Sequence, residues 1–130
     1  MDAIVIAGGI PKPEDPLYEF TQGGPKALVD VAGKPMIQWV LDAISGTESV
    51  ERVVLISLSE EQGLECSKPV TYLPDQGGLL ENVRGGIVKA VEINPQATHI
   101  LTVSSDIPTI KSEMIDWMVS ENSKTDLDLY

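Results

Sequence analysis

Three short segments of the sequence combine residue types that can hold a phosphorylated ligand. The first is Gly8-Gly9, where two residues without Cβ let the backbone turn sharply and bring its N–H groups close to a phosphate. The second contains Lys26, a cation that follows Pro25, whose ring restrains the backbone before it. The third contains Asp106, a carboxylate of the kind that Mg²⁺ takes as a ligand. A glycine loop, a cation and a carboxylate would together suit a phosphate-bearing ligand bound with a metal ion.

Each of these residues also has an ordinary structural interpretation. Gly8-Gly9 could form a simple tight turn, Asp106 could cap a turn, and Lys26 could be a solvated surface lysine. Two familiar phosphate loops are excluded, because the residues after Gly8 lack the spacing G-x-G-x-x-G and nothing in the chain matches G-x-x-x-x-G-K-[ST]. Pro11 also prevents a helix from starting directly after the glycines. A dinucleotide-binding or P-loop protein is therefore disfavoured.

The elements that must position these residues alternate between strands and helices. Continuous apolar runs predict strands at 3–7, 52–57, 70–73 and 99–104. Apolar residues at helical spacing predict helices over about 35–46, 80–91 and 112–122, the last with Ser112 as its cap. Four prolines within 10–25 predict a long loop. This order is typical of a layered α/β domain with a mostly parallel sheet, in which ligands gather at the carboxyl ends of the strands.

Composition limits the class of protein. A chain of 130 residues with 42% hydrophobic residues is expected to form one folded unit. A net charge of −11 predicts a surface that repels nucleic acid and anionic membranes, so a polyanionic ligand would need a local basic patch or a bound cation. The first residues match neither a signal peptide nor a membrane span, and the single Cys66 cannot form an internal disulfide. We therefore expect a cytoplasmic protein.

The order of the motifs closely resembles that of the nucleotidyltransferases of the nucleotide-diphospho-sugar transferase superfamily, which includes the MobA-like NTP transferases. The resemblance rests on Ala7-Gly8-Gly9, then Gly24-Pro25-Lys26-Ala27-Leu28, then Gly33-Lys34-Pro35-Met36 entering an amphipathic helix. It implies a three-layer α/β/α, Rossmann-like domain of the GT-A type. It also implies transfer of a nucleoside monophosphate from a nucleoside triphosphate to a phosphorylated acceptor, with release of pyrophosphate.

The resemblance assigns expected roles to individual residues. Lys26 would contact the triphosphate as the catalytic residue, and Asp106, in an Asp-x-Pro segment, would bind Mg²⁺. The block from Gly77 to Gly86 resembles the family segment that holds the base and ribose at a helix start. Lys12 would replace an arginine that many relatives carry in the first loop, although as a point charge. The expected nucleotide-binding residues are thus Ala7, Gly8, Gly9, Lys12, Lys26, Gly77, Gly78 and Asn82.

The resemblance also sets the expected extent and partners of the chain. Residues 1–130 would form the N-terminal, nucleotide-binding part of one domain, with the acceptor part and a second metal carboxylate beyond Tyr130. The 130 residues would then be inactive alone, and the alternation over 125–130 would begin a further strand. Partners would be a nucleoside triphosphate, a phosphorylated small molecule and a second copy of the chain, but neither nucleic acid nor membrane. The alternative is a non-catalytic nucleotide-binding or regulatory domain of the same fold.

Overall fold

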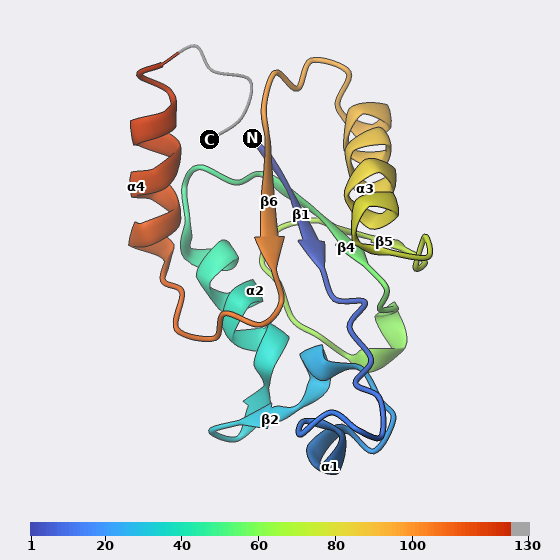
Figure 1. Ribbon diagram of the computed structural model, residues 1–130. Coiled ribbons are helices and arrows are strands. Elements are labelled where there is room, and N and C mark those ends of the chain that lie inside the picture. Colours follow the sequence, from blue (N-terminus) through green and yellow to red (C-terminus); the bar gives the residue numbers. More distant parts are fainter. Residues whose placement is uncertain (126–130) are drawn as a thin grey trace.

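A four-stranded parallel sheet forms the centre of the computed structural model, which describes residues 1–125 (Figure 1). Its strands are β1 (Asp2–Ile6), β4 (Arg52–Ile56), β5 (Val70–Leu73) and β6 (Ile100–Ser104). They lie in the order β5-β4-β1-β6, and each neighbouring pair is parallel. All four strands therefore end at the same edge of the sheet, and the residues that follow them come together there.

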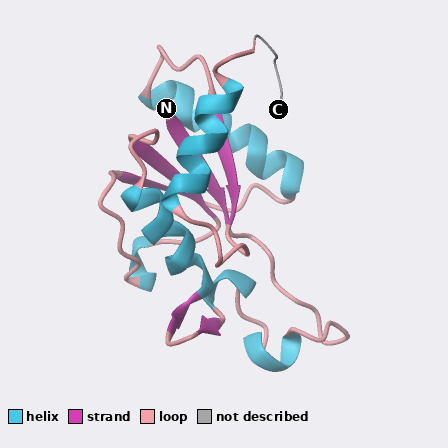
Figure 2. Cartoon of the chain, turned by 90° about the vertical axis from the view of Figure 1, so that its left-hand side faces the viewer, coloured by secondary structure: helices cyan, strands magenta, loops and turns pink. Residues whose placement is uncertain are grey.

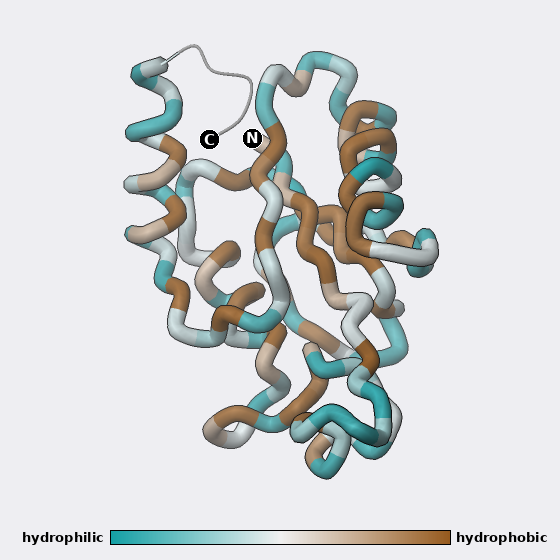
Figure 3. The backbone as a smooth tube through the Cα atoms, viewed as in Figure 1, coloured by the Kyte–Doolittle hydropathy of each residue, from teal (hydrophilic) through white to brown (hydrophobic). Residues whose placement is uncertain are grey.

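Helices cover both faces of this sheet. Helices α2 (Met36–Gly46) and α4 (Ser112–Asn122) pack on one face, which Figure 2 shows from the front, and α3 (Leu79–Ile93) packs on the other. Alternate residues of β1 enter opposite cores: Val5 packs with the α2 side, whereas Ile4 packs with Ala90 of α3. Strands β1 and β4 are apolar on both faces for this reason, and Figure 3 shows the hydrophobic colour running along β1.

Helix α3 approaches the sheet closely through Gly86. A Cβ built at this position would lie 2.7 Å from Cδ1 of Ile56 and 3.1 Å from Cγ2 of Ile4. The glycine pair inside the helix, which costs about 1 kcal/mol per residue relative to alanine, therefore has a packing reason at Gly86. The neighbouring Gly85 faces the side chain of Gln76 instead.

A long connection follows β1 and lies beyond the strand ends, at the bottom of Figure 1. It contains the one-turn helix α1 (Tyr18–Thr21), the 3₁₀ turn η1 (Lys26–Leu28) and a small antiparallel hairpin of β2 (Asp30–Val31) and β3 (Lys34–Pro35). A second 3₁₀ turn, η2 (Glu60–Gln62), follows β4. The loop is closed at its base, because the backbone N–H of Lys26 donates to the carbonyl of Gly9 at 2.8 Å.

The predicted α/β/α architecture with a parallel sheet is confirmed. The predicted cap of α4 is wrong: Lys111 occupies the N-cap, while the Ser112 hydroxyl donates to the carbonyl of Ala43 in α2 at 2.8 Å. The serine thus ties two helices together instead of capping one. The strand expected from 125 onward falls on residues 126–130, which lie outside the described residues. No helix within 1–125 has the length and apolar character needed to cross a membrane.

Candidate functional site

The carboxyl ends of the four strands gather the polar residues and glycines that could bind a ligand. Gly8-Gly9 follow β1, Ser57 follows β4, and Asp75 and Asp106 come shortly after β5 and β6. Between these loops lies a hollow of about 270 Å³ whose lining consists of Ile6, Gly8, Gly9, Asp75, Gly77, Gly78, Leu79 and Asn82. Segments from opposite ends of the described chain therefore meet at one edge of the sheet.

Most of the expected nucleotide-binding residues lie at this edge. Gly8, Gly9, Gly77, Gly78 and Asn82 all line the hollow. Two others do not. Ala7 is buried beneath it, where its backbone N–H donates to the carbonyl of Ile56 at 3.1 Å, and Lys12 is exposed in the long loop.

Gly8 is required by the close approach of three polar side chains. A Cβ at this position would lie 2.7 Å from Oγ of Ser57, 3.0 Å from Oδ1 of Asp75 and 3.2 Å from Nδ2 of Asn82. Gly9 is less constrained, because the nearest atom to a Cβ there would be Cε of Lys26 at 3.6 Å, an ordinary contact distance. Steric contact therefore requires a glycine at position 8 but not at position 9.

A hydrogen-bonded network fixes the wall of the hollow. Asp75 accepts from Nδ2 of Asn82 at 2.8 Å, from Oγ of Ser57 at 3.0 Å and from the backbone N–H of Gly77 at 3.2 Å. Asn82, which is buried, also accepts from the backbone N–H of Gln76 at 2.7 Å. The hydrogen bonds from Asn82 and then Ser57 lower the pKa of Asp75. The network therefore presents an ionised, oriented carboxylate.

Ser57 reaches Asp75 through an unusual backbone conformation. Its φ is 74°, in the left-handed region that residues other than glycine rarely adopt, and its backbone N–H donates to the carbonyl of Leu73 at 2.9 Å. Sequence reasoning missed both Ser57 and Asp75. Ser57 is the last residue of a predicted strand and Asp75 lies shortly after another, and this position at strand ends was the available signal.

Lys26 and Asp106 form an ion pair beside this hollow. Nζ of Lys26 lies 2.6 Å from Oδ2 of Asp106, with the two side chains 31% and 36% exposed. The hydroxyl of Ser104 donates a short hydrogen bond to Oδ1 of the same carboxylate. Lys26 and then Ser104 lower the pKa of Asp106. The two residues that were expected to contact triphosphate and metal are thus brought together.

The donors around Asp106 fit a hard divalent cation such as Mg²⁺. Asp106 and Ser104 offer only oxygen atoms, and Asp106 is accessible to solvent at the strand end. Within 1–125 no group of three or more His, Cys, Asp or Glu side chains could hold a metal ion. Oxygen donors are the ligands that Mg²⁺ prefers, and it commonly completes its shell with water and substrate phosphates.

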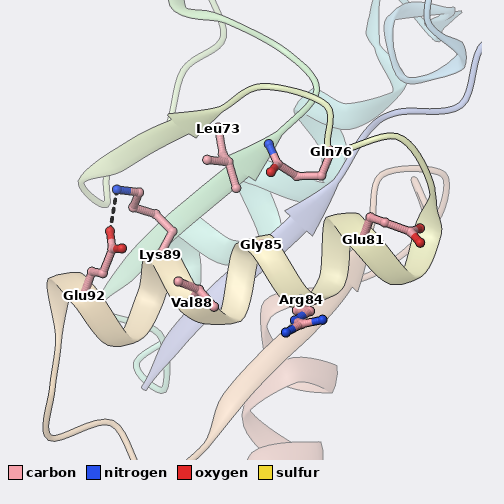
Figure 4. Close-up of a pocket in the computed structure, with 8 residues that line it drawn as sticks. All are labelled: Leu73, Gln76, Glu81, Arg84, Gly85, Val88, Lys89 and Glu92. Atoms are coloured by element: carbon pink, nitrogen blue, oxygen red, sulfur yellow. Dashed lines mark hydrogen bonds and ion pairs between the residues drawn. The ribbon is translucent and has the colours of Figure 1, made fainter.

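Another hollow, of about 430 Å³, lies between β5 and α3 (Figure 4). Its charged side chains are two acids and two bases, and Lys89 is already paired with Glu92 at 2.6 Å. Arg84 points away from Leu73 and Gln76 in Figure 4. The charges of this hollow therefore balance, and neither Lys26, Asp106 nor the Gly8-Gly9 backbone lines it.

A parallel α/β/α domain with glycine loops, a lysine and a carboxylate at its carboxyl edge has the Rossmann-like fold of the nucleotidyltransferases. The chain belongs to the MobA-like NTP transferase domain family, whose profile matches residues 3–129. The resemblance seen in the motifs is thereby confirmed.

Similar proteins include a molybdenum cofactor guanylyltransferase, a bifunctional protein and a transferase of known structure. The chain is 25% identical to the molybdenum cofactor guanylyltransferase of Shewanella sediminis over 129 residues, which are 99% of this chain and 60% of that protein. It is 29% identical to the bifunctional protein GlmU of Thermoanaerobacter pseudethanolicus over 125 residues, 92% of this chain and 26% of that one. A hypothetical transferase from Thermus thermophilus of known structure superposes with a TM-score of 0.67 and 33% identity, over 92% of this chain and 46% of that one. The chain thus spans only part of the length of each relative.

Proposed function

We propose that the chain binds a nucleoside triphosphate at the strand-end hollow and serves as the nucleotide-binding part of a nucleotidyltransferase. The parent enzyme would transfer a nucleoside monophosphate to a phosphorylated small molecule and release pyrophosphate. The observation that carries this proposal is the position of Lys26, whose backbone bonds to Gly9 and whose ammonium meets Asp106 at the edge of the glycine-lined hollow. In this arrangement a cation, a carboxylate and the backbone of two glycines lie next to one another.

The hollow fits the nucleoside end of the ligand. A volume of about 270 Å³ is smaller than typical pockets for whole cofactors, so the phosphates would extend out of it along Gly8-Gly9 toward Lys26. Leu79, at the start of α3, is 68% exposed and offers an apolar surface to a base. Asp75 can accept hydrogen bonds from N–H groups of the base or from ribose hydroxyls.

The triphosphate end of the ligand requires positive charge. The hollow and its border hold two carboxylates, Asp75 and Asp106, against the single ammonium of Lys26, in a chain whose net charge is −11. Lys26 and backbone N–H groups near Gly8-Gly9 would stabilise phosphate oxygens. A divalent cation such as Mg²⁺, held partly by Asp106, would supply the remaining neutralisation of phosphate charge.

The proposed reaction needs positioning more than covalent chemistry. An anionic oxygen of the acceptor phosphate attacks the α-phosphorus in line, and the bond from the α-phosphorus to the bridging oxygen breaks. Pyrophosphate leaves with the electron pair, so that no proton transfer or covalent enzyme intermediate is needed. Lys26 and the glycine loop would hold the phosphates in the reactive geometry and stabilise the charge that develops on them.

Thermal-shift measurements with each common nucleoside triphosphate, with and without Mg²⁺, test the binding part of the proposal. At a ligand concentration of about 100 times Kd, binding should stabilise the fold by about 2.7 kcal/mol, which a melting curve resolves. In the presence of Mg²⁺, Lys26→Ala and Asp106→Ala should lose most of the shift, whereas Lys89→Ala, in the other hollow, should keep it. The proposal fails if no triphosphate shifts the melting temperature, or if all three variants respond like the wild type.

Pyrophosphate exchange into the nucleoside triphosphate tests turnover separately. Exchange that depends on Lys26 and Asp106 supports the nucleotidyltransferase. Binding without exchange, in a protein that contains the acceptor part of the domain, would support the alternative of a non-catalytic nucleotide-binding domain.

A further inference from the structure

Both oxygens of the Asp106 carboxylate already have partners within the protein. Oδ1 accepts from the hydroxyl of Ser104, and Oδ2 accepts from Nζ of Lys26 at 2.6 Å. The two residues that the proposed function assigns to the metal and the triphosphate therefore neutralise each other in this state. In this state neither group presents its full charge to a ligand.

A divalent cation that binds Oδ2 of Asp106 would lie close to the ammonium of Lys26, which is 2.6 Å from the same oxygen. Both are positive and both need the same oxygen at hydrogen-bond or coordination distance, so the arrival of one repels the other. Oδ1 is less affected, because Ser104 is uncharged and can retain its hydrogen bond. The geometry therefore marks Oδ2 as the atom at which the two positive groups compete.

The ammonium of Lys26 can leave Asp106 without a change in the backbone. The backbone N–H of Lys26 is fixed on the carbonyl of Gly9 at 2.8 Å, and the side chain runs past Gly9, with Cε at 3.6 Å from a Cβ built there. Rotation about the terminal side-chain bonds can take Nζ off Asp106 while Cε stays beside Gly9. That is where the proposed function places the phosphates.

We propose that Lys26 is a placeholder on Asp106, and that binding of a divalent cation takes Oδ2 from the lysine and releases its ammonium to the triphosphate. Ser104 acts as a positioning residue that holds Oδ1 during this exchange. Cation and nucleotide consequently bind as coupled events. This inference rests on the proposed function, since it requires a triphosphate at this edge.

A double-mutant cycle on metal-free binding separates this exchange from simple charge removal. The dissociation constant of the triphosphate identified by the thermal-shift panel is measured by calorimetry in EDTA. The proteins compared are the wild type, Asp106→Asn, Lys26→Met and the double variant. We expect Asp106→Asn to tighten metal-free binding by about tenfold when Lys26 is present, because the substitution frees the ammonium. A tenfold change is of the size usually measured between residues in contact.

In the Lys26→Met background, the same substitution removes only a repulsive negative charge and should tighten binding by about threefold or less. An equal gain in both backgrounds would overturn the inference. If the wild type binds no triphosphate even with Mg²⁺, the proposed function itself fails. If binding depends on Lys26 but the cycle is additive, only the placeholder role fails.

An NMR titration of the wild type tests the exchange without relying on the folding of any variant. Mg²⁺ alone, without nucleotide, should shift the side-chain ¹⁵N resonance of Lys26 in an NMR titration, because the cation displaces the ammonium from Asp106. The resonance of Lys89, which pairs with Glu92, is the internal control. A Lys26 resonance that does not respond more than that of Lys89 would contradict the exchange.

Discussion

Lys26 and Asp106 are 80 positions apart in the sequence, yet their side chains meet at 2.6 Å. The contact joins the end of the long loop after β1 to the end of β6. It lowers the pKa of Asp106 below its ordinary value of 3.8, with a smaller contribution from Ser104. A group whose pKa is lowered by folding contributes stability above its ordinary pKa, and that contribution is lost as the pH falls through the lowered value.

We predict that Lys26→Met raises the pKa of Asp106 toward its ordinary value, because the main cause of the shift is removed. Ser104→Ala should raise it by less. Both values can be measured from the ¹³C resonance of the Asp106 carboxyl group during a pH titration. An Asp106 pKa that is unchanged in Lys26→Met would show that the ion pair does not persist in solution.

Gly8→Ala should destabilise the fold and close the hollow. The added methyl group would lie 2.7 Å from Oγ of Ser57, and overpacking of this kind costs about 1–3 kcal/mol. Gly9→Ala is the matched control, since its nearest neighbour would lie at 3.6 Å. Urea denaturation measures both variants. Adding Ser57→Ala to Gly8→Ala should recover part of the loss, and equal stability of the two glycine variants would refute the packing argument.

The strand ends at Gly8-Gly9 and Asp106 could be predicted because β1 and β6 are apolar runs that stop abruptly. The network of Ser57 and Asp75 could not. Strand β5 lies at the edge of the sheet, is only half-buried, and has a weak apolar pattern. Moreover, the contact between Ser57 and Asp75 depends on β5 lying next to β4, and residue spacing does not specify strand order.

The ion pair of Lys26 and Asp106 was also beyond sequence reasoning, although each residue was a candidate. Its formation depends on how the loop over 10–25 folds back, and this is set by contacts such as that of Lys26 with Gly9. The cap prediction at Ser112 failed for a related reason. A local pattern suggested a helix cap, but the nearby carbonyl of Ala43 in another helix provides the hydroxyl with a tertiary partner.

Adjacent glycines in α3 should respond to alanine to different extents. Gly86→Ala places a methyl group 2.7 Å from Cδ1 of Ile56 inside the core, so the loss from overpacking, about 1–3 kcal/mol, outweighs a gain in helix propensity of about 1 kcal/mol. Gly85→Ala places its methyl group 2.9 Å from Cγ of Gln76, whose exposed side chain can shift, so the net loss should be smaller than at Gly86. Chemical denaturation of the two variants checks the prediction, and a stabilised Gly86→Ala would contradict the close helix packing.

Asp116 on α4 should make the stability of the fold depend on acid pH. Its carboxylate accepts hydrogen bonds from the hydroxyl of Thr47 and from the hydroxyl and backbone N–H of Ser49, at 2.6 and 3.0 Å for Ser49. The hydrogen bonds from Ser49 and then Thr47 lower the pKa of Asp116 from 3.8 to about 2. The carboxylate therefore contributes stability above pH 3.8, and this contribution is lost as the pH falls toward 2.

In Asp116→Asn that pH-dependent contribution should be absent. The variant should be less stable than the wild type at neutral pH, and the difference should shrink between pH 3.8 and 2 as the wild-type carboxylate becomes protonated. Thermal unfolding at a series of pH values measures this, with Glu61→Gln, an exposed acid on η2, as the control that should follow the wild type. If the wild type stays more stable than Asp116→Asn by the same amount down to pH 2, the stabilisation by Asp116 comes from the shape of its side chain and not from its charge.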